Sequence, residues 1–141
     1  MSVLREARLE DSSEINKISR FLGYANVLDE VANDRLKNLL SSKLNCVWVY
    51  ENENGIVGWI HIFHASRVAS EGFIEIGGLV VNPQYRREGI GRTLVEHAKE
   101  YSRSQGLKLR VRFNSKREEV HRFYQSIGFS CAKSQYVFES S

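Results

Sequence analysis

The 141-residue sequence predicts one α/β domain, spanning residues 1–141, with a mixed, largely antiparallel sheet of about seven strands and about four helices. Three observations lead to this class. Strand-like and helix-like segments follow one another in the order β α α β β β α β α β β. Residues 46–50 and 56–63 are apolar on both faces, which is typical of central strands covered by helices. Residues 90–101 carry apolar side chains at helical spacing.

The first half of the chain is expected to contain four strands and two helices. Asp-Ser-Ser-Glu at residues 11–14 has the spacing of a capping box that opens a helix. Asn-Glu-Asn-Gly at residues 52–55 is typical of a hairpin turn. Two adjacent glycines, Gly77 and Gly78, lie within the fourth strand and indicate a β-bulge or a close backbone approach. The expected elements are strand 3–8, a helix from residue 11, a helix over 29–43, and strands 46–50, 56–63 and 72–81.

The second half is expected to alternate helices with strands. Residues 107–113 alternate strictly between apolar and basic side chains, which predicts a strand with one polar face. Ser115-x-x-Glu118 has the spacing of a second capping box, and Gly128 marks the end of the helix that it opens. The expected elements are a helix from residue 90 that ends at Gly106, strand 107–113, a helix over 115–127, and strands 129–131 and 135–138.

The composition excludes several classes of protein. The longest apolar runs are too short to span a membrane, and the opening MSVLREARLED lacks the apolar stretch of a signal peptide. Cys46 and Cys131 have no metal-ligand spacing, so we expect free thiols in a cytoplasmic protein and no metal. A net charge of +3 suits an anionic ligand but is too small to indicate nucleic acid.

The segment RREGIG, residues 86–91, joins the fourth strand to the helix that begins near residue 90. Glycines here let the backbone approach a ligand, and the N–H groups and dipole of a helix start favour an anion, most often phosphate. The segment lacks the Gly-Lys-Ser/Thr of a P-loop and the third glycine of a dinucleotide fingerprint. From these residues alone, a tight turn with a capped helix is as well supported as a phosphate site.

Two flanking motifs resemble those of the GNAT superfamily of N-acetyltransferases. The stretch EIGGLVVNPQYRREGIGRTLVEHA resembles its acetyl-CoA motif, in which Gln/Arg-x-x-Gly-x-Gly/Ala is matched by Arg86-x-x-Gly89-x-Gly91. An aromatic-Tyr pair followed by Gly-Phe is matched by Phe123-Tyr124-x-x-x-Gly-Phe. The two motifs cover about residues 72–130 in the order and at the separation that the family requires.

The resemblance implies acetyl-CoA as co-substrate and no metal. In the family, the loop before the helix grips the CoA pyrophosphate, and the preceding strand pairs through its backbone with the pantetheine arm. This strand splays from the next one at a bulge, for which Gly77-Gly78 is the expected place. The implied cofactor-binding residues of this strand and loop are Leu79, Val80, Val81, Arg86, Arg87, Glu88, Gly89, Ile90, Gly91, Arg92 and Thr93.

The resemblance also implies catalytic roles for three residues. A primary amine has a reference pKa of about 10, so a base must take its proton near neutral pH. Glu75 lies eleven residues before Arg86, where several family members carry a general-base glutamate. The N–H of Leu79 falls where the family polarises the thioester carbonyl, and Tyr124 matches the usual general acid. These roles imply direct transfer in a ternary complex.

Other interpretations of these residues stay open. Tyr124 shares a helical face with Ile127 and could be a core residue, and Glu75 could be a solvated strand carboxylate. His61 or His64 could serve as the base instead. Their spacing of three along a strand puts them on opposite faces, which argues against a shared metal.

The sequence departs from the family at one position. Many members carry asparagine seven residues before the tyrosine, where this chain has Arg117 and the nearest asparagine is Asn114. We therefore expect Asn114, Lys116 and Tyr124 to contact CoA, with Arg117 as an alternative phosphate contact. This pattern and the ending at residues 133–138 resemble aminoalkylphosphonate and aminoglycoside 6′-N-acetyltransferases.

The expected function is therefore transfer of an acetyl group from acetyl-CoA to a primary amine, with a small molecule as the expected acceptor. Two alternatives remain: a protein or peptide N-acetyltransferase, and a catalytically idle CoA sensor on the same fold. No nucleic-acid or membrane partner is expected, and a homodimer is one option for the oligomeric state.

Overall fold

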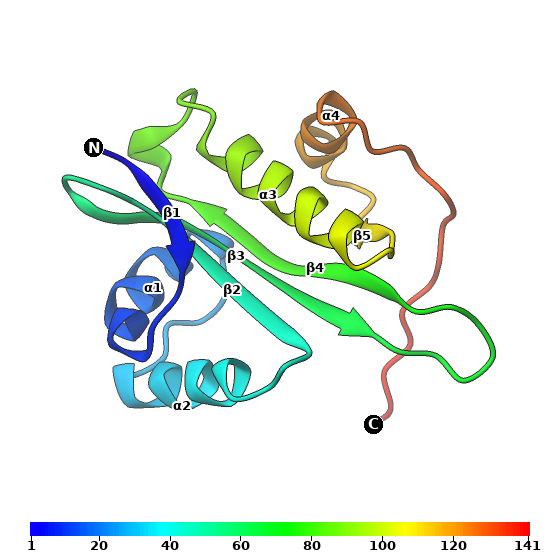
Figure 1. Cartoon of the computed structure of the whole chain (residues 1–141), viewed down its shortest axis with the longest axis horizontal. Coiled ribbons are helices and arrows are strands. Elements are labelled where there is room, and N and C mark those ends of the chain that lie inside the picture. The colour runs from blue at the N-terminus through cyan, green and yellow to red at the C-terminus, as the bar shows by residue number, and fades with distance from the viewer.

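The apolar runs of the sequence form the central strands of a five-stranded sheet in the computed structural model, which describes residues 1–141 (Figure 1). The strand order is β1-β2-β3-β4-β5, and all neighbours are antiparallel except β4 and β5, which are parallel. The elements are β1 (Val3–Glu6), α1 (Ser12–Ser19), α2 (Asp29–Leu40), β2 (Asn45–Asn52), β3 (Gly55–Ala65), β4 (Phe73–Val81), α3 (Ile90–Ser104), β5 (Leu109–Val111) and α4 (Glu118–Ser126), with the short 3-10 helices η1 (Leu9–Asp11), η2 (Arg20–Leu22) and η3 (Pro83–Tyr85).

Helices cover both faces of the sheet, as the two-sided apolar strands predicted. Figure 1 shows the sheet between α3 and α4 above and α1 and α2 below. Ile60 and Ile62 of β3 are fully buried in the core cluster that includes Leu94 of α3. Val49 of β2 is fully buried in the opposite cluster, with Leu36 of α2. Each such side chain contributes about 1.5–3 kcal/mol through burial, so the two clusters hold the helices to the sheet.

The two predicted capping boxes are wrong, and in the first of them both side chains bond to other partners. The carboxylate of Asp11 accepts the N–H of Arg8 at 2.7 Å, which caps η1, and it also binds Arg5. Glu14 accepts the backbone N–H of Ile56 at the start of β3, at 2.9 Å. The second box fails because α4 begins at Glu118 without a side-chain cap.

The two predicted C-terminal strands are also wrong, and the sheet has five strands instead of about seven. Residues 129–141 form no strand, and Tyr136 and Phe138 are 93% and 91% exposed. A strand needs a partner ladder, and no strand pairs with this segment because the sheet ends at the three residues of β5.

Asp11 joins β1 to the first helical layer. It is 7% exposed, and Arg5 donates to both of its oxygens, at 2.8 and 3.0 Å. These hydrogen bonds from Arg5 hold the pKa of Asp11 below its usual range. A carboxyl group with a depressed pKa stabilises the fold above its unfolded pKa, about 3.9, and this contribution is lost as pH falls through the folded pKa.

We expect Asp11→Asn to lower the free energy of unfolding by about 1.5–3 kcal/mol at pH 7, because a hydrogen-bonded charge pair is broken. The difference from the wild type should shrink as pH falls below about 4. Urea unfolding at several pH values measures both effects. Asp34→Asn is the control, since Asp34 is exposed and its side chain makes no hydrogen bond within the chain. Equal loss in both variants would contradict the role of Asp11.

Candidate active site

A β-bulge in β4 is the first feature of the candidate site. In the antiparallel pair with β3, His61 lies opposite Gly78 and Ile62 lies opposite Ile76, which leaves Gly77 as the extra residue. This confirms the bulge predicted from the two glycines. A Cβ on Gly77 would lie 2.8 Å from Nδ1 of His61, so the histidine ring occupies the space that a side chain would need. The same holds for Gly78, because a Cβ there would lie 2.8 Å from the ring of Trp59.

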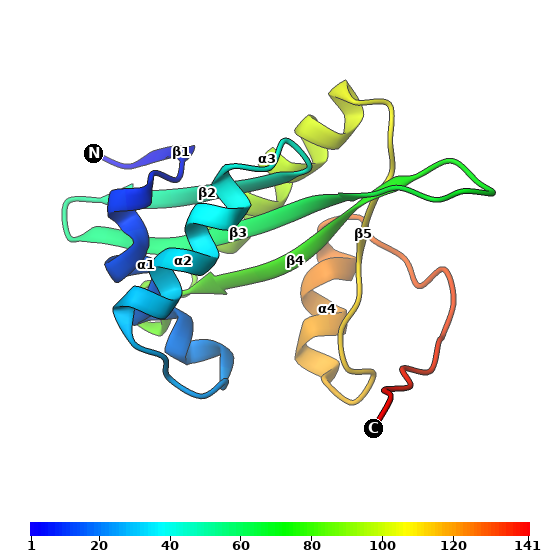
Figure 2. The same cartoon turned by 90° about the horizontal axis from the view of Figure 1, so that it is seen from below.

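Beyond the bulge, β4 has a free edge. Its parallel pairing with β5 ends at Ile76 and Val111, and Figure 2 shows the two strands diverging from there. The N–H of Asn82 donates to Val57 at 2.8 Å, toward β3. Because backbone N–H directions alternate along a strand, the N–H groups of Leu79 and Val81 point to the opposite, unpaired edge.

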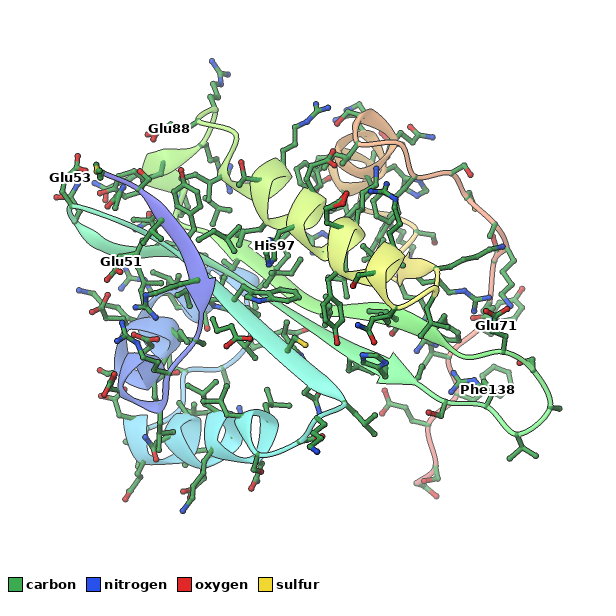
Figure 3. All side chains as sticks on the ribbon, in the orientation of Figure 1. Glu51, Glu53, Glu71, Glu88, His97 and Phe138 are labelled. Carbon is green, nitrogen blue, oxygen red and sulfur yellow. The ribbon has the colours of Figure 1, made fainter.

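The loop between η3 and α3 presents six consecutive backbone donors. The N–H groups of residues 87–92 donate to no carbonyl and to no side chain of the protein. Arg87 and Gly89 adopt positive φ, 69° and 75°, and Gly89 is the N-cap of α3. Turns of this kind expose successive N–H groups to a single anion, next to the positive end of the helix dipole. Glu88 lies at the outer tip of the loop (Figure 3).

Charge around this loop is positive on balance. Arg86 and Arg87 are exposed and have no carboxylate within ion-pair distance, and Arg92 lies 4.0 Å from Glu96 at the edge of that range. The hydroxyl of Thr93 donates to the carbonyl of Gly89 at 2.9 Å and is therefore used within the helix.

The two motifs of the sequence meet where α4 packs against the start of α3. A Cβ on Gly91 would lie 3.3 Å from the ring of Phe123, so glycine allows this close packing. The next residue, Tyr124, is 6% exposed, and its ring stacks on Phe113 and meets Phe129 edge-on. The tyrosine ring is therefore part of the core, as one of the two interpretations of its helical face predicted.

The hydroxyl of Tyr124 is less enclosed than its ring. It makes no hydrogen bond within the protein. Every fully buried side-chain oxygen of the protein has a hydrogen-bond partner, so the hydroxyl of Tyr124 is not fully buried. Burial raises the pKa of Tyr124 to about 12. The group therefore keeps its proton throughout the physiological range and can donate a hydrogen bond.

Glu75 lies on the face of β4 that looks toward α1 and α2. Its side chain is 9% exposed, and Oε2 accepts from Nε and Nη2 of Arg112, at 3.2 and 3.0 Å. Two further cations stand nearby without a carboxylate partner. The guanidinium groups of Arg67 and Arg110 lie 4.9 and 4.1 Å from the ring centroid of Phe73. Figure 2 views the sheet from this side, and neither α1 nor α2 covers the end where β4 pairs with β5.

The remaining predicted residues lie apart from one another. Val80 is buried in the cluster under α1 and α2, so its side chain faces away from α3. Asn114 accepts the N–H of Lys116 at 3.0 Å within its own turn, and neither side chain bonds to residues 86–93. His64 contacts Tyr101 of α3 at 3.0 Å, on the face opposite to His61, as their spacing predicted.

Two residues of this region have no signal in the sequence. Asn45 of β2 lies 2.8 Å from Nε2 of His61, and Trp59 covers Gly78. Both positions depend on the register between strands, which a single sequence does not contain. No group of three or more His, Cys, Asp or Glu side chains gathers as a metal site would require. None of the helices combines the length and the apolar character that a membrane span requires.

Comparison with known proteins places these features in a family. The sequence model of the acetyltransferase (GNAT) domain matches residues 43–131. N-acetyltransferase family 8 member 3 of Rattus norvegicus is 32% identical over 95 residues, which are 66% of this chain and 42% of that protein. The chain thus spans less than half the length of this curated relative.

Solved structures share the fold at low sequence identity. An acetyltransferase from Trypanosoma brucei superposes with a TM-score of 0.84 at 23% identity, over 99% of this chain and all of that one. Aminoglycoside N-acetyltransferase AAC(6′)-Iy in complex with CoA superposes with a TM-score of 0.87 at 12% identity, over 99% and 95% of the two chains. The domain match covers well over half of the chain, from the second strand past the last helix, and the chain therefore belongs to the GNAT acetyltransferase family.

Proposed function

We propose that the protein transfers the acetyl group of acetyl-CoA to the primary amine of a small molecule. The observation that carries the proposal is the row of unpaired N–H groups at residues 87–92, at the start of α3 and beside the free edge of β4. A diphosphate supplies the acceptors that this row lacks. The unpaired guanidinium groups of Arg86 and Arg87 suit its negative charge.

The free edge of β4 suits the pantetheine arm of the same molecule. An extended chain with amide groups can add to an open sheet edge through backbone hydrogen bonds. Val81 lies nearer the loop and would hold an amide of the arm. Leu79 lies nearer the bulge, where its N–H would stabilise the oxyanion that forms on the thioester carbonyl.

Tyr124 is proposed to serve the leaving group. Its neutral hydroxyl can donate to the sulfur as negative charge develops there. The high pKa that burial causes keeps this donor protonated at the pH of the reaction. Asn114 and Lys116, between β5 and α4, are proposed as further contacts to CoA from the side of α4.

The amine is proposed to approach from the face that carries Glu75. This end of the sheet is not covered by α1 or α2 (Figure 2), and Glu75 is the carboxylate proposed to assist proton removal there. Arg67 and Arg110 add unpaired positive charge beside it. A small-molecule acceptor is supported by the shared fold with an aminoglycoside N-acetyltransferase.

A panel of amines tests the function. We expect release of CoA thiol from acetyl-CoA with one group among aminoalkylphosphonates, aminoglycosides, polyamines and amino acids. Amines that carry an anionic group are the first candidates, because the unpaired Arg67 and Arg110 would attract that group. Release only with peptides would replace the small-molecule acceptor by a protein or peptide. If acetyl-CoA binds but no amine or peptide leads to release of CoA thiol, the result would favour the idle CoA sensor.

Gly89→Asp is expected to weaken CoA binding by roughly 10- to 100-fold, because one charge-assisted hydrogen bond contributes about 1.5–3 kcal/mol. The new carboxylate would repel the pyrophosphate, and its Cβ would strain a positive φ. Gly106→Asp is the matched control, since Gly106 has φ of 70° and open surroundings at the other end of α3. Calorimetric titration with CoA compares them, and equal affinity in the two variants would contradict the proposed pyrophosphate site.

Tyr124→Phe is expected to lower the turnover number by roughly 100-fold while CoA affinity changes little, because a positioned acid typically contributes that much or more. Tyr136→Phe is the control, since Tyr136 is 93% exposed. Steady-state kinetics and CoA titration measure the two quantities. Unchanged turnover would leave Tyr124 with a packing role only.

The raised pKa of Tyr124 has a separate effect on stability. An unfolded tyrosine loses its proton near pH 10, whereas the folded one keeps it to about pH 12. The stabilising effect is therefore complete below pH 10 and is lost as pH rises toward 12. Urea unfolding between these values should show a shallower loss in Tyr124→Phe than in the wild type.

A further inference from the structure

His61 is held in one orientation by β2. Its Nε2 lies 2.8 Å from Oδ1 of Asn45. The amide of Asn45 is itself oriented, because its Nδ2 donates to the hydroxyl of Ser42 at 3.2 Å. An amide oxygen only accepts hydrogen bonds. The neutral imidazole therefore carries its proton on Nε2, which leaves a lone pair on Nδ1.

This lone pair faces the bulge of β4. Nδ1 lies 2.8 Å from the place that a Cβ on Gly77 would occupy. It has no hydrogen-bond partner in the protein, and it is not fully enclosed. The bulge also begins the free edge of β4, whose first outward N–H belongs to Leu79. A basic nitrogen and an oxyanion donor thus lie on either side of Gly78.

The surroundings of His61 keep the imidazole neutral. Burial alone lowers its pKa from the ordinary value of 6.5, and no charged neighbour contributes. Asn45 is its neutral partner on β2, and Phe63 lies beside it on β3. Glu75 of β4 and Arg112 after β5 are paired with each other on this face of the sheet. Arg67 and Arg110 lie over the ring of Phe73 at the same end and have no carboxylate partner. The helices above this face present Ser19 of α1 and Leu39 of α2 to the sheet. The charged Glu14 of α1 also reaches the sheet, at Ile56, the second residue of β3.

We propose that His61 is a catalytic residue that takes the proton of the acceptor's ammonium group on Nδ1, with Asn45 as its positioning residue. This inference rests on the proposed acetyl transfer. The ammonium group gives one proton to Nδ1, which passes it to solvent after the reaction. The freed amine forms a C–N bond with the acetyl carbonyl carbon, and the C–S bond breaks. Tyr124 gives its proton to the leaving sulfur, and the nitrogen's second proton restores the tyrosine hydroxyl, which leaves the amide and CoA thiol.

The proposal gives Glu75 and His61 different tasks on the same face. One oxygen of Glu75 is held by two nitrogens of Arg112, so the carboxylate is neutralised by a fixed partner. An imidazole has a reference pKa of about 6.5, nearer to the working pH than the value of about 4.3 for a glutamate, and is therefore the more effective general base. The Glu75–Arg112 pair is suited to orient the amine, and Glu75 assists proton removal in this way.

His61→Gln is the first test, because glutamine can keep a hydrogen bond to Asn45 but cannot take a proton. We expect kcat/KM at pH 7 to fall roughly 100-fold or more, with CoA affinity unchanged and partial recovery at high pH, where the amine is already neutral. The acid limb of the wild-type pH profile, with its midpoint below 6.5, should disappear. His64→Gln is the matched control on the opposite face of β3 and should keep this limb.

Asn45→Asp tests the positioning role. A carboxylate partner favours the imidazolium form, so the pKa of His61 rises and the acid limb moves to higher pH. Loss of the limb in Glu75→Gln together with its retention in His61→Gln would overturn the proposal in favour of the glutamate. An unmoved limb in Asn45→Asp would also count against His61.

Nitrogen-15 NMR of the imidazole gives a test that needs no activity. We expect His61, assigned by its absence in His61→Gln, to be the Nε2–H tautomer and to titrate below pH 6.5. An Nδ1–H tautomer or a higher titration midpoint would overturn the proposal. A wild-type protein with this tautomer that acetylates no amine would instead show that the proposed function, and with it a catalytic role for His61, is wrong.

Discussion

The extra residue at Gly77 controls most of the site. An antiparallel pair with one residue too many must bend and twist the bulged strand, and β4 leaves β5 directly before this point. The bend frees the backbone donors of the following residues, which would otherwise pair with a neighbouring strand. The bulge can form here because two aromatic rings of β3 lie over two glycines. A side chain at either glycine would collide with a ring, so packing and backbone geometry require the same residue type.

The loop of residues 86–91 depends on β4 and on the last helix, α4. The chain leaves the end of β4 through η3 and enters α3 with two residues at positive φ. The helix start is then fixed from the other side, where Phe123 packs on Gly91 and Tyr124 enters the same core as α3. Fixing the loop on both sides lowers the entropy that it loses when a ligand binds. This packing also brings together two motifs about thirty residues apart in the sequence.

Charge is distributed unevenly between the two sides of β4. On the side of the loop, unpaired arginines and backbone donors favour a strongly anionic ligand. On the face toward α1 and α2, the main acid is paired with arginine and the histidine is neutral. A neutral base in a partly buried place costs less than a buried charge, and it can accept a proton without repelling a cationic amine. The two sides thus suit two different reactants.

The sequence by itself determined the central strands, the helices on both faces, the bulge and the glycine-containing loop that opens a helix. Each of these depends on short-range features: apolar periodicity, paired glycines and the start of a helix. Only the tertiary structure decided the rest. The side chains of the predicted capping box at Asp11 and Glu14 bond to residues outside the box, and the last strands do not form because no strand supplies them with a partner ladder. The contact of Asn45 with His61 depends on the register of β2 against β3. Register and side-chain partners are set by contacts between residues far apart in the chain, and no local pattern records them.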